Sequence, residues 1–189
     1  MKRLILASAS PRRRELLAQI GLEFEVIPSG AEEVITKTQP DQVVEELSAQ
    51  KADDVAARIE EGIVIGSDTI VWKDGHIMGK PHSREEAFEM LRAIQGSTHS
   101  VFTGVTVLVK ENQKVIRHTF SEETRVHVYP MTEEETERYL DTGEPMDKAG
   151  AYGIQGKFAA WVKGIEGDYH SVVGLPVAAL WQVLKNYLI

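Results

Sequence analysis

The sequence predicts an α/β protein with α+β character, in which a twisted mixed sheet is flanked by helices in two lobes. Short apolar runs alternate with segments of helical periodicity, a pattern typical of parallel strands joined by helices. Two long strand-like runs, Val101–Val109 and Val115–Val128, follow each other around the turn Lys110–Gln113. Neighbouring long strands of this kind indicate antiparallel pairing, so the expected sheet is mixed.

The N-terminal third alternates strands and helices. The expected elements are a strand over 3–7, a helix over 11–20 ended by Gly21, a strand over 24–27, a helix over 41–61 ended by Gly62, and a buried parallel strand over 63–65. Ser10 suits the N-cap of the first helix, and Pro11 suits its first helical position.

The remaining elements carry clear turn and cap signals. The expected elements are a hairpin of 70–72 with 76–78 around Lys73-Asp74-Gly75, a helix over 83–95, a helix over 132–140, a strand over 158–162 and a closing helix over 177–187. The segment 144–156 is rich in glycine and small residues and supports no clear prediction. Trp181 and Leu184 of the closing helix either fill the core or pack on a partner.

Composition limits the classes of function. The 189 residues suit one domain over 1–189, and the net charge of -8 argues against nucleic-acid and anionic-membrane partners. The absence of cysteine excludes disulfides, thiolate catalysis and zinc–cysteine sites. No apolar run approaches the ~20 residues that span a bilayer, and the four apolar residues after Arg3 are too few for a signal peptide. A cytoplasmic protein is therefore expected.

Arg12, Arg13 and Arg14 stand in the first turn of the helix that Ser10 caps. Positive charge at a helix N-terminus opposes the helix dipole and costs roughly 0.3–1 kcal/mol per residue. Helix N-termini bind phosphate through unpaired N–H groups, and arginine binds phosphate oxygens in pairs. The residues alone leave two interpretations open, a phosphate site or a solvated basic patch in which one arginine is paired to a carboxylate.

Several carboxylates and lysines are candidates for chemistry. Asp68 follows the apolar run 63–65, and a carboxylate past the end of a strand can hold Mg²⁺ or deprotonate water; the alternative is a common turn or cap residue. Glu32 and Glu33 can add a metal contact or form a solvated pair. Lys51 and Lys80 can each reach a phosphate as a point charge or lie on the surface.

Two further side chains have narrower interpretations. His99 has no second histidine at metal spacing, so a hydrogen-bonded core residue is favoured over a zinc ligand. The Gln155 amide both donates and accepts, so it can recognise the edge of a base or simply occupy a turn. Together these residues suit metal-assisted cleavage of a phosphoanhydride, and they suit equally a module that binds nucleotide without cleaving it.

Several blocks of the sequence resemble the Maf family of nucleoside triphosphate pyrophosphatases. The matching blocks are Leu6–Leu17, Gly66–Thr69, Gly79–Pro81, His99–Val101 with Thr103–Gly104, Asp147–Gly156 and Gly174–Pro176. The resemblance covers nearly the whole chain in order. It implies an elongated fold with a deep cleft, similar to inosine triphosphate pyrophosphatases.

The resemblance also implies a reaction and roles for residues. The reaction is hydrolysis of a nucleoside triphosphate to the monophosphate and pyrophosphate with Mg²⁺ or Mn²⁺, and Asp68 matches the proton acceptor. The positions that match phosphate or substrate contacts are Ser8, Arg12, Arg13, Lys51 and Lys80. Glu33 matches a carboxylate near the metal, so Glu33 and Asp68 are the expected metal ligands. The family's usual aspartate before Glu33 is Glu32 here, which departs from the pattern.

Three positions indicate the branch of the family. Arg12, Thr69 and Gln155 resemble the branch that acts on dTTP and UTP, which implies those substrates and modified pyrimidine relatives. The expected partner is the nucleotide, and the family's habit of forming dimers adds a homodimer. The alternatives are a purine triphosphate substrate and a nucleotide-binding regulator of cell division that has no turnover.

Overall fold

The computed structural model describes residues 2–189. Its strands are β1 (Leu4–Leu6), β2 (Glu25–Val26), β3 (Gly62–Lys73), β4 (His76–Met78), β5 (Thr98–Glu111), β6 (Lys114–Val128) and β7 (Val162–Glu166). Its α-helices are α1 (Pro11–Gln19), α2 (Pro40–Ala56), α3 (Arg84–Ile94), α4 (Glu133–Leu140), α5 (Tyr169–Val173) and α6 (Val177–Leu188). Three short 3₁₀ helices are η1 (Glu144–Asp147), η2 (Ala149–Ala151) and η3 (Lys157–Ala160).

The strands of the described chain form one mixed sheet. Its hydrogen-bonded order is β2-β1-β3-β5-β6-β7, and β4 pairs with β3. β1 is parallel to β2 and β3, whereas β4 is antiparallel to β3 and β7 is antiparallel to β6. This arrangement confirms the predicted mixed α/β class.

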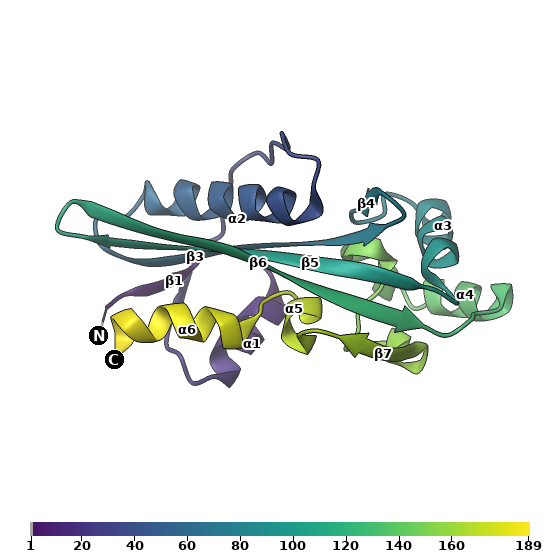
Figure 1. Ribbon diagram of the computed structural model, residues 1–189. Coiled ribbons are helices and arrows are strands. Elements are labelled where there is room, and N and C mark those ends of the chain that lie inside the picture. The colour runs from purple at the N-terminus through teal and green to yellow at the C-terminus, as the bar shows by residue number, and fades with distance from the viewer. Residues whose placement is uncertain (1) are drawn as a thin grey trace. The chain divides into compact units, whose positions relative to one another are not determined.

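The chain divides into two compact units, which are described separately. Unit 1 comprises residues 2–68, 103–122 and 174–189, and unit 2 comprises residues 69–102 and 123–173. In unit 1, α2 covers one face of the strands while α1 and α6 lie on the other face (Figure 1). Leu184 of α6 is fully buried, which confirms that it fills the core, and Trp181 is partly exposed.

Two glycines let α2 approach the sheet closely. A Cβ built on Gly66 of β3 would lie 2.2 Å from the Ser48 carbonyl oxygen, and one built on Gly104 of β5 would lie 2.3 Å from the Val44 carbonyl oxygen. No side chain fits at either position, so the backbone of α2 rests directly on β3 and β5. This close packing sets the distance between α2 and β3. Lys51 lies about one turn after Ser48 on α2, and Asp68 lies on β3.

Unit 2 is built around α3 and a group of aromatic rings. α3 packs on α4 and on η2. Tyr139, Tyr152, Phe158 and Trp161 pack together with ring centroids 4.6–6.1 Å apart. Much of the segment 144–160, most of which has no clear local signal in the sequence, forms short 3₁₀ helices, and Tyr152 and Phe158 of this segment belong to the aromatic group.

Two boundary predictions are wrong for different physical reasons. α2 ends at Ala56 rather than Glu61, and Gly62 begins β3. The Lys110 ammonium of β5 donates to the carbonyl oxygens of Ala56 (2.8 Å) and Ile59 (2.7 Å), which caps the end of the helix from outside. The strand predicted over 158–162 is wrong over 158–161: Phe158 is buried in the aromatic group within η3, and β7 begins only at Val162.

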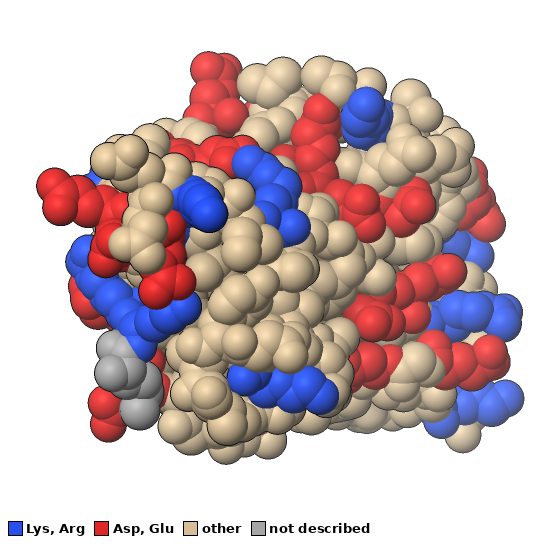
Figure 2. All heavy atoms as spheres, turned by 60° about the vertical axis from the view of Figure 1, so that its left-hand side comes forward, with Lys and Arg blue, Asp and Glu red and all other residues tan. Residues whose placement is uncertain are grey.

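The charged side chains are distributed unevenly over one face of the molecule. Figure 2 shows acidic and basic side chains mixed toward the edges of that face, around a central area of mostly uncharged residues. Within residues 2–189, every helix is too short or too polar to cross a bilayer.

Candidate active site

The N-terminus of α1 has the predicted cap. The Ser10 hydroxyl accepts a hydrogen bond from the Arg13 backbone N–H (3.4 Å), and Pro11 is the first helical residue. The Arg13 side chain turns back from the helix: Nη1 donates to Ser8 Oγ (3.2 Å) and Nε donates to the Gly174 carbonyl oxygen (2.8 Å). The guanidinium is therefore held in one place, between the end of β1 and the loop before α6.

The surroundings of Arg13 combine burial and charge. Burial is the largest influence and lowers the pKa of Arg13 below its ordinary value, while the negative charge of Asp68 raises it and Arg12 lowers it further. An arginine remains protonated under these conditions because its ordinary pKa is so high. The site thus holds a fixed positive charge close enough to Asp68 to interact with it electrostatically.

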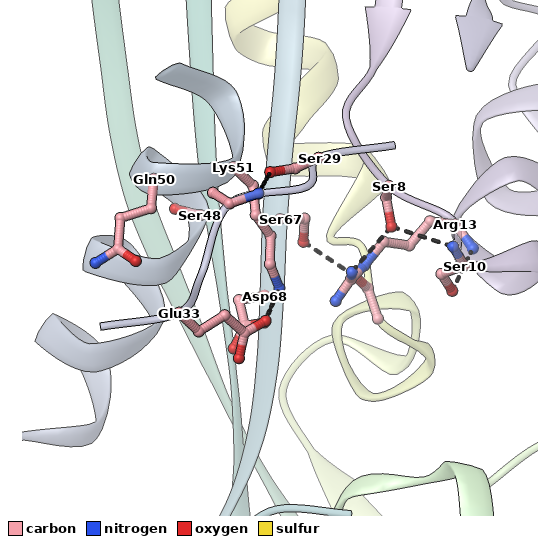
Figure 3. Close-up of polar contacts among 12 residues, drawn as sticks. Ser8, Ser10, Arg13, Ser29, Glu33, Ser48, Gln50, Lys51, Ser67 and Asp68 are labelled. Atoms are coloured by element: carbon pink, nitrogen blue, oxygen red, sulfur yellow. Dashed lines mark hydrogen bonds and ion pairs between the residues drawn. The ribbon is translucent and has the colours of Figure 1, made fainter. Parts of the chain in front are cut away.

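Lys51 brings the two predicted carboxylates together. Its ammonium lies 2.5 Å from Asp68 Oδ1 and 2.9 Å from Glu33 Oε1 (Figure 3). The Lys51 and Asp68 side chains are 17% and 13% exposed, whereas Glu33 is 54% exposed. The ammonium offsets the repulsion between the carboxylates, which come from β3 and from the loop between β2 and α2.

Asp68 lies within a strand and not after one. β3 continues from Gly62 to Lys73, so the prediction that the strand ends near Ile65 is wrong, as is the alternative that Asp68 is a turn residue. The polar residues are accommodated in the strand because each has a partner: Ser67 Oγ donates to the Gly174 carbonyl oxygen (3.3 Å), and Asp68 is paired with Lys51. Gly174 therefore contacts both Ser67 and Arg13.

The pair of carboxylates fits a hard divalent cation. Mg²⁺ prefers oxygen ligands and is usually bound by one or two carboxylates together with substrate phosphates. Within residues 2–189, no group of three or more histidine, aspartate or glutamate side chains is placed to hold a metal ion. Metal binding by Glu33 and Asp68 stays a prediction. Glu32 is exposed.

The other predicted site residues belong to unit 2. Thr69 follows Asp68 on β3 and is partly buried, while Lys80 and Gln155 are exposed. The Gly150 N–H donates to the Gly79 carbonyl oxygen (3.1 Å), so the loop that carries Lys80 lies against η2. The grouping of these residues with Asp68 stays a prediction.

His99 is a core residue, as its isolation in the sequence predicts. It is 3% exposed, and its Nε2 lies 2.6 Å from the Tyr152 hydroxyl. Burial is the largest of several influences that lower its pKa to about 4, so the imidazole is neutral at pH 7.

The roles of Ser67 and Gly174 do not follow from the sequence analysis. Ser67 lies in the matching block Gly66–Thr69, so its position next to Asp68 is a usable signal. Gly174 lies in the matching block Gly174–Pro176 and has a φ of +133°, so the glycine is a signal for its position, although the contacts are made by its carbonyl oxygen.

Comparison with known proteins identifies the family of the chain. The family model described as "Maf-like protein" matches residues 3–187. The chain belongs to the Maf family. Relatives named dTTP/UTP pyrophosphatase include those of Agathobacter rectalis (51% identity, covering 98% of each chain) and Bacillus cytotoxicus (51% identity, 99% of this chain and 96% of the relative). Another from Lachnoclostridium phytofermentans is 49% identical over 99% of this chain and 96% of its own.

A solved structure supports the fold class of this Maf member. The Ham1 protein of Staphylococcus aureus aligns over 98% of this chain and 99% of its own, with a TM-score of 0.55 and 13% identity. At that identity the likeness concerns the fold alone.

Proposed function

We propose that this protein hydrolyses dTTP and UTP to the nucleoside monophosphate and pyrophosphate. The observation that carries the proposal is the pairing of Asp68 with Lys51 beside the fixed guanidinium of Arg13. Unit 1 then contains the residue proposed as the base, Asp68, the cation Lys51 that pairs with it, and the N-terminus of α1, which we propose binds phosphate. The names of the relatives supply the substrate class.

Asp68 acts as the general base in this proposal. Its carboxylate accepts a proton from a water molecule, and the water oxygen forms a bond to the α-phosphorus. The bond from the α-phosphorus to the bridging oxygen breaks, and pyrophosphate leaves with that oxygen. Lys51 orients the carboxylate in the resting site and can move its charge to a phosphate as the nucleotide arrives.

The phosphate chain is held by the basic side chains predicted for that role. Arg12 and Arg13 at the start of α1 bind the phosphate oxygens with Ser8, and Lys80 adds a further positive charge. Glu33 and Asp68 would hold Mg²⁺ or Mn²⁺. When bound, this ion neutralises charge that develops on the phosphate oxygens.

The pyrimidine is distinguished by Arg12, Thr69 and Gln155. The Gln155 amide can pair with a pyrimidine edge because it both donates and accepts. Modified pyrimidine triphosphates would enter the same site, which gives the protein a role in cleansing the nucleotide pool.

A substrate panel tests the proposal. The protein is incubated with each of dTTP, UTP, dGTP, inosine triphosphate and 7-methyl-GTP, with Mg²⁺ omitted and then restored, and pyrophosphate is measured. We expect dTTP and UTP to be cleaved only with the metal. A purine that wins by about tenfold in kcat/KM, about 1.4 kcal/mol, contradicts the pyrimidine assignment. Nucleotide affinity without pyrophosphate would instead favour a regulator of cell division.

A further inference from the structure

The loop that carries Glu33 is fastened along one face of α2. Residues 29–36, here called the strap, contain no helix or strand. The Asp54 carboxylate accepts hydrogen bonds from Ser29 Oγ (2.8 Å) and the Gly30 N–H (2.9 Å). At the other end, the Glu46 carboxylate accepts from the Thr36 N–H (2.8 Å) and from Thr36 Oγ1 (2.5 Å).

Gln50 holds the middle of the strap. Its Oε1 accepts from the Val34 N–H (3.0 Å), and its Nε2 donates to the Val34 carbonyl oxygen (2.6 Å). An amide satisfies both backbone groups of one residue because its oxygen accepts and its nitrogen donates. Val34 directly follows Glu33, so the amide restrains the backbone next to the carboxylate.

The three fastening residues share one face of the helix. Glu46, Gln50 and Asp54 are spaced four apart, and side chains at that spacing lie above one another along a helix. They meet the strap in reverse chain order, so strap and helix run in opposite directions. The next residue after Gln50 is Lys51, whose ammonium contacts Glu33. Figure 3 shows Gln50 and Lys51 on α2, with Glu33 and Asp68 close together.

We propose that Gln50 is a positioning residue: its paired hydrogen bonds to Val34 hold Glu33 beside Asp68 and thereby set how much divalent metal the reaction needs. The proposal rests on the proposed function for the role of Glu33. Val34 and Ile35 are 54% and 52% exposed, so side-chain burial does little to hold this part of the strap. The hydrogen bonds from α2 therefore carry the restraint.

Limited proteolysis reports on the strap without any nucleotide. Lys37 is exposed just beyond the strap and provides a trypsin site. We expect Gln50→Met, which removes both hydrogen bonds without adding charge, to speed cleavage after Lys37 about tenfold through local opening. Gln50→Glu keeps the acceptor and loses the donor, so its rate should lie between those of Gln50→Met and the unchanged protein. Gln42→Met is the matched control, because Gln42 is an exposed glutamine on the same helix.

Kinetics then separate positioning from a merely structural role. We expect Gln50→Met to raise the half-saturating Mg²⁺ concentration for dTTP hydrolysis about tenfold, because the backbone next to Glu33 loses its restraint, an effect of the size seen when support of a metal ligand is lost. The kcat at saturating Mg²⁺ should change less than twofold, and Gln42→Met should behave as the unchanged protein.

Two results overturn the positioning role. One is an unchanged cleavage rate, and the other is faster cleavage with an unchanged Mg²⁺ requirement. A thermal melt of each variant verifies that it is folded. If the wild-type protein releases no pyrophosphate from dTTP, the proposed function fails. The rates of trypsin cleavage after Lys37 still decide whether Gln50 fastens the strap.

Discussion

The first turn of α1 and the first turn of α4 use the same cap and opposite charges. Ser10 and Thr132 each accept a hydrogen bond from the backbone N–H three residues later. In α4 that residue is Glu135, whose carboxylate accepts the Thr132 N–H (2.8 Å) and closes a capping box. In α1 the equivalent residue is Arg13, which has no acceptor to offer.

In α1, Ser8 provides the acceptor for the N-cap N–H that a glutamate provides in α4. Its hydroxyl oxygen accepts the Ser10 N–H (3.2 Å), the bond that a glutamate makes in α4. The same oxygen accepts a hydrogen bond from Arg13 Nη1 (3.2 Å). An upstream serine thus completes the cap and leaves the third helical position available for a cation.

The difference separates folding from function. α3 and α4 carry glutamates in their first turns, as the helix dipole favours, and α1 carries no acid there. Each arginine in the first turn lowers the stability of the helix by roughly 0.3–1 kcal/mol, so the stability of α1 does not explain why arginines stand there. The anionic substrate that we propose to bind at the N-terminus of α1 would supply that reason, and the following variants test it.

Asp68→Asn should have the largest effect, because it separates holding the anion from cleaving it. We expect kcat for dTTP to fall about 10²–10⁴-fold, the usual contribution of a general base. Nucleotide affinity, measured by calorimetry, should stay within a few-fold because the basic turn is intact. A variant with full activity excludes Asp68 as the base.

Arg13→Glu gives α1 the acidic pattern of α4. We expect kcat/KM for dTTP to fall about 10²–10³-fold, as when a fixed donor to a charged oxygen is lost. Arg14→Glu is the matched control, since Arg14 is exposed in the same turn. Equal losses from both variants would indicate a diffuse basic patch and not a site built around Arg13.

Ser8→Ala should have an intermediate effect on two measurements together. The Ser10 N–H and Arg13 Nη1 both lose an acceptor, so we expect the free energy of unfolding to fall by about 1 kcal/mol. Because Arg13 loses part of its support, kcat/KM should fall about tenfold. Urea unfolding and steady-state kinetics measure the two effects. A loss of stability with unchanged kinetics would separate the cap from the site.

The smallest effect should be on stability alone. Arg14→Glu removes a positive charge from the start of α1, so we expect the free energy of unfolding to rise by roughly 0.3–1 kcal/mol. Glu133→Arg makes the opposite change in α4 and should lower it by a similar amount. Urea unfolding at low salt measures both. Changes of the same sign in the two helices would contradict the dipole account.

Local signals in the sequence predicted much of the fold. Ser10-Pro11 marked the start of α1, Thr132 and Glu135 marked α4, and Asp74-Gly75 marked the turn between β3 and β4. In each case the deciding contacts lie within four residues. In the turn, Asp74 and Gly75 both have positive φ, which this pair of residues tolerates. The residue types of Asp68, Glu33 and Lys51 also identified them individually as site candidates.

The tertiary structure decided where these residues meet and where several elements stop. α2 ends where Lys110, 54 residues beyond Ala56, caps its carbonyl oxygens. Arg13 is fixed by a carbonyl oxygen 161 residues away, and Glu33 is brought beside Asp68 by Lys51 and by the fastened strap. A local pattern records the preferences of neighbouring residues. It does not record contacts between distant segments, least of all contacts made by backbone atoms that every residue shares.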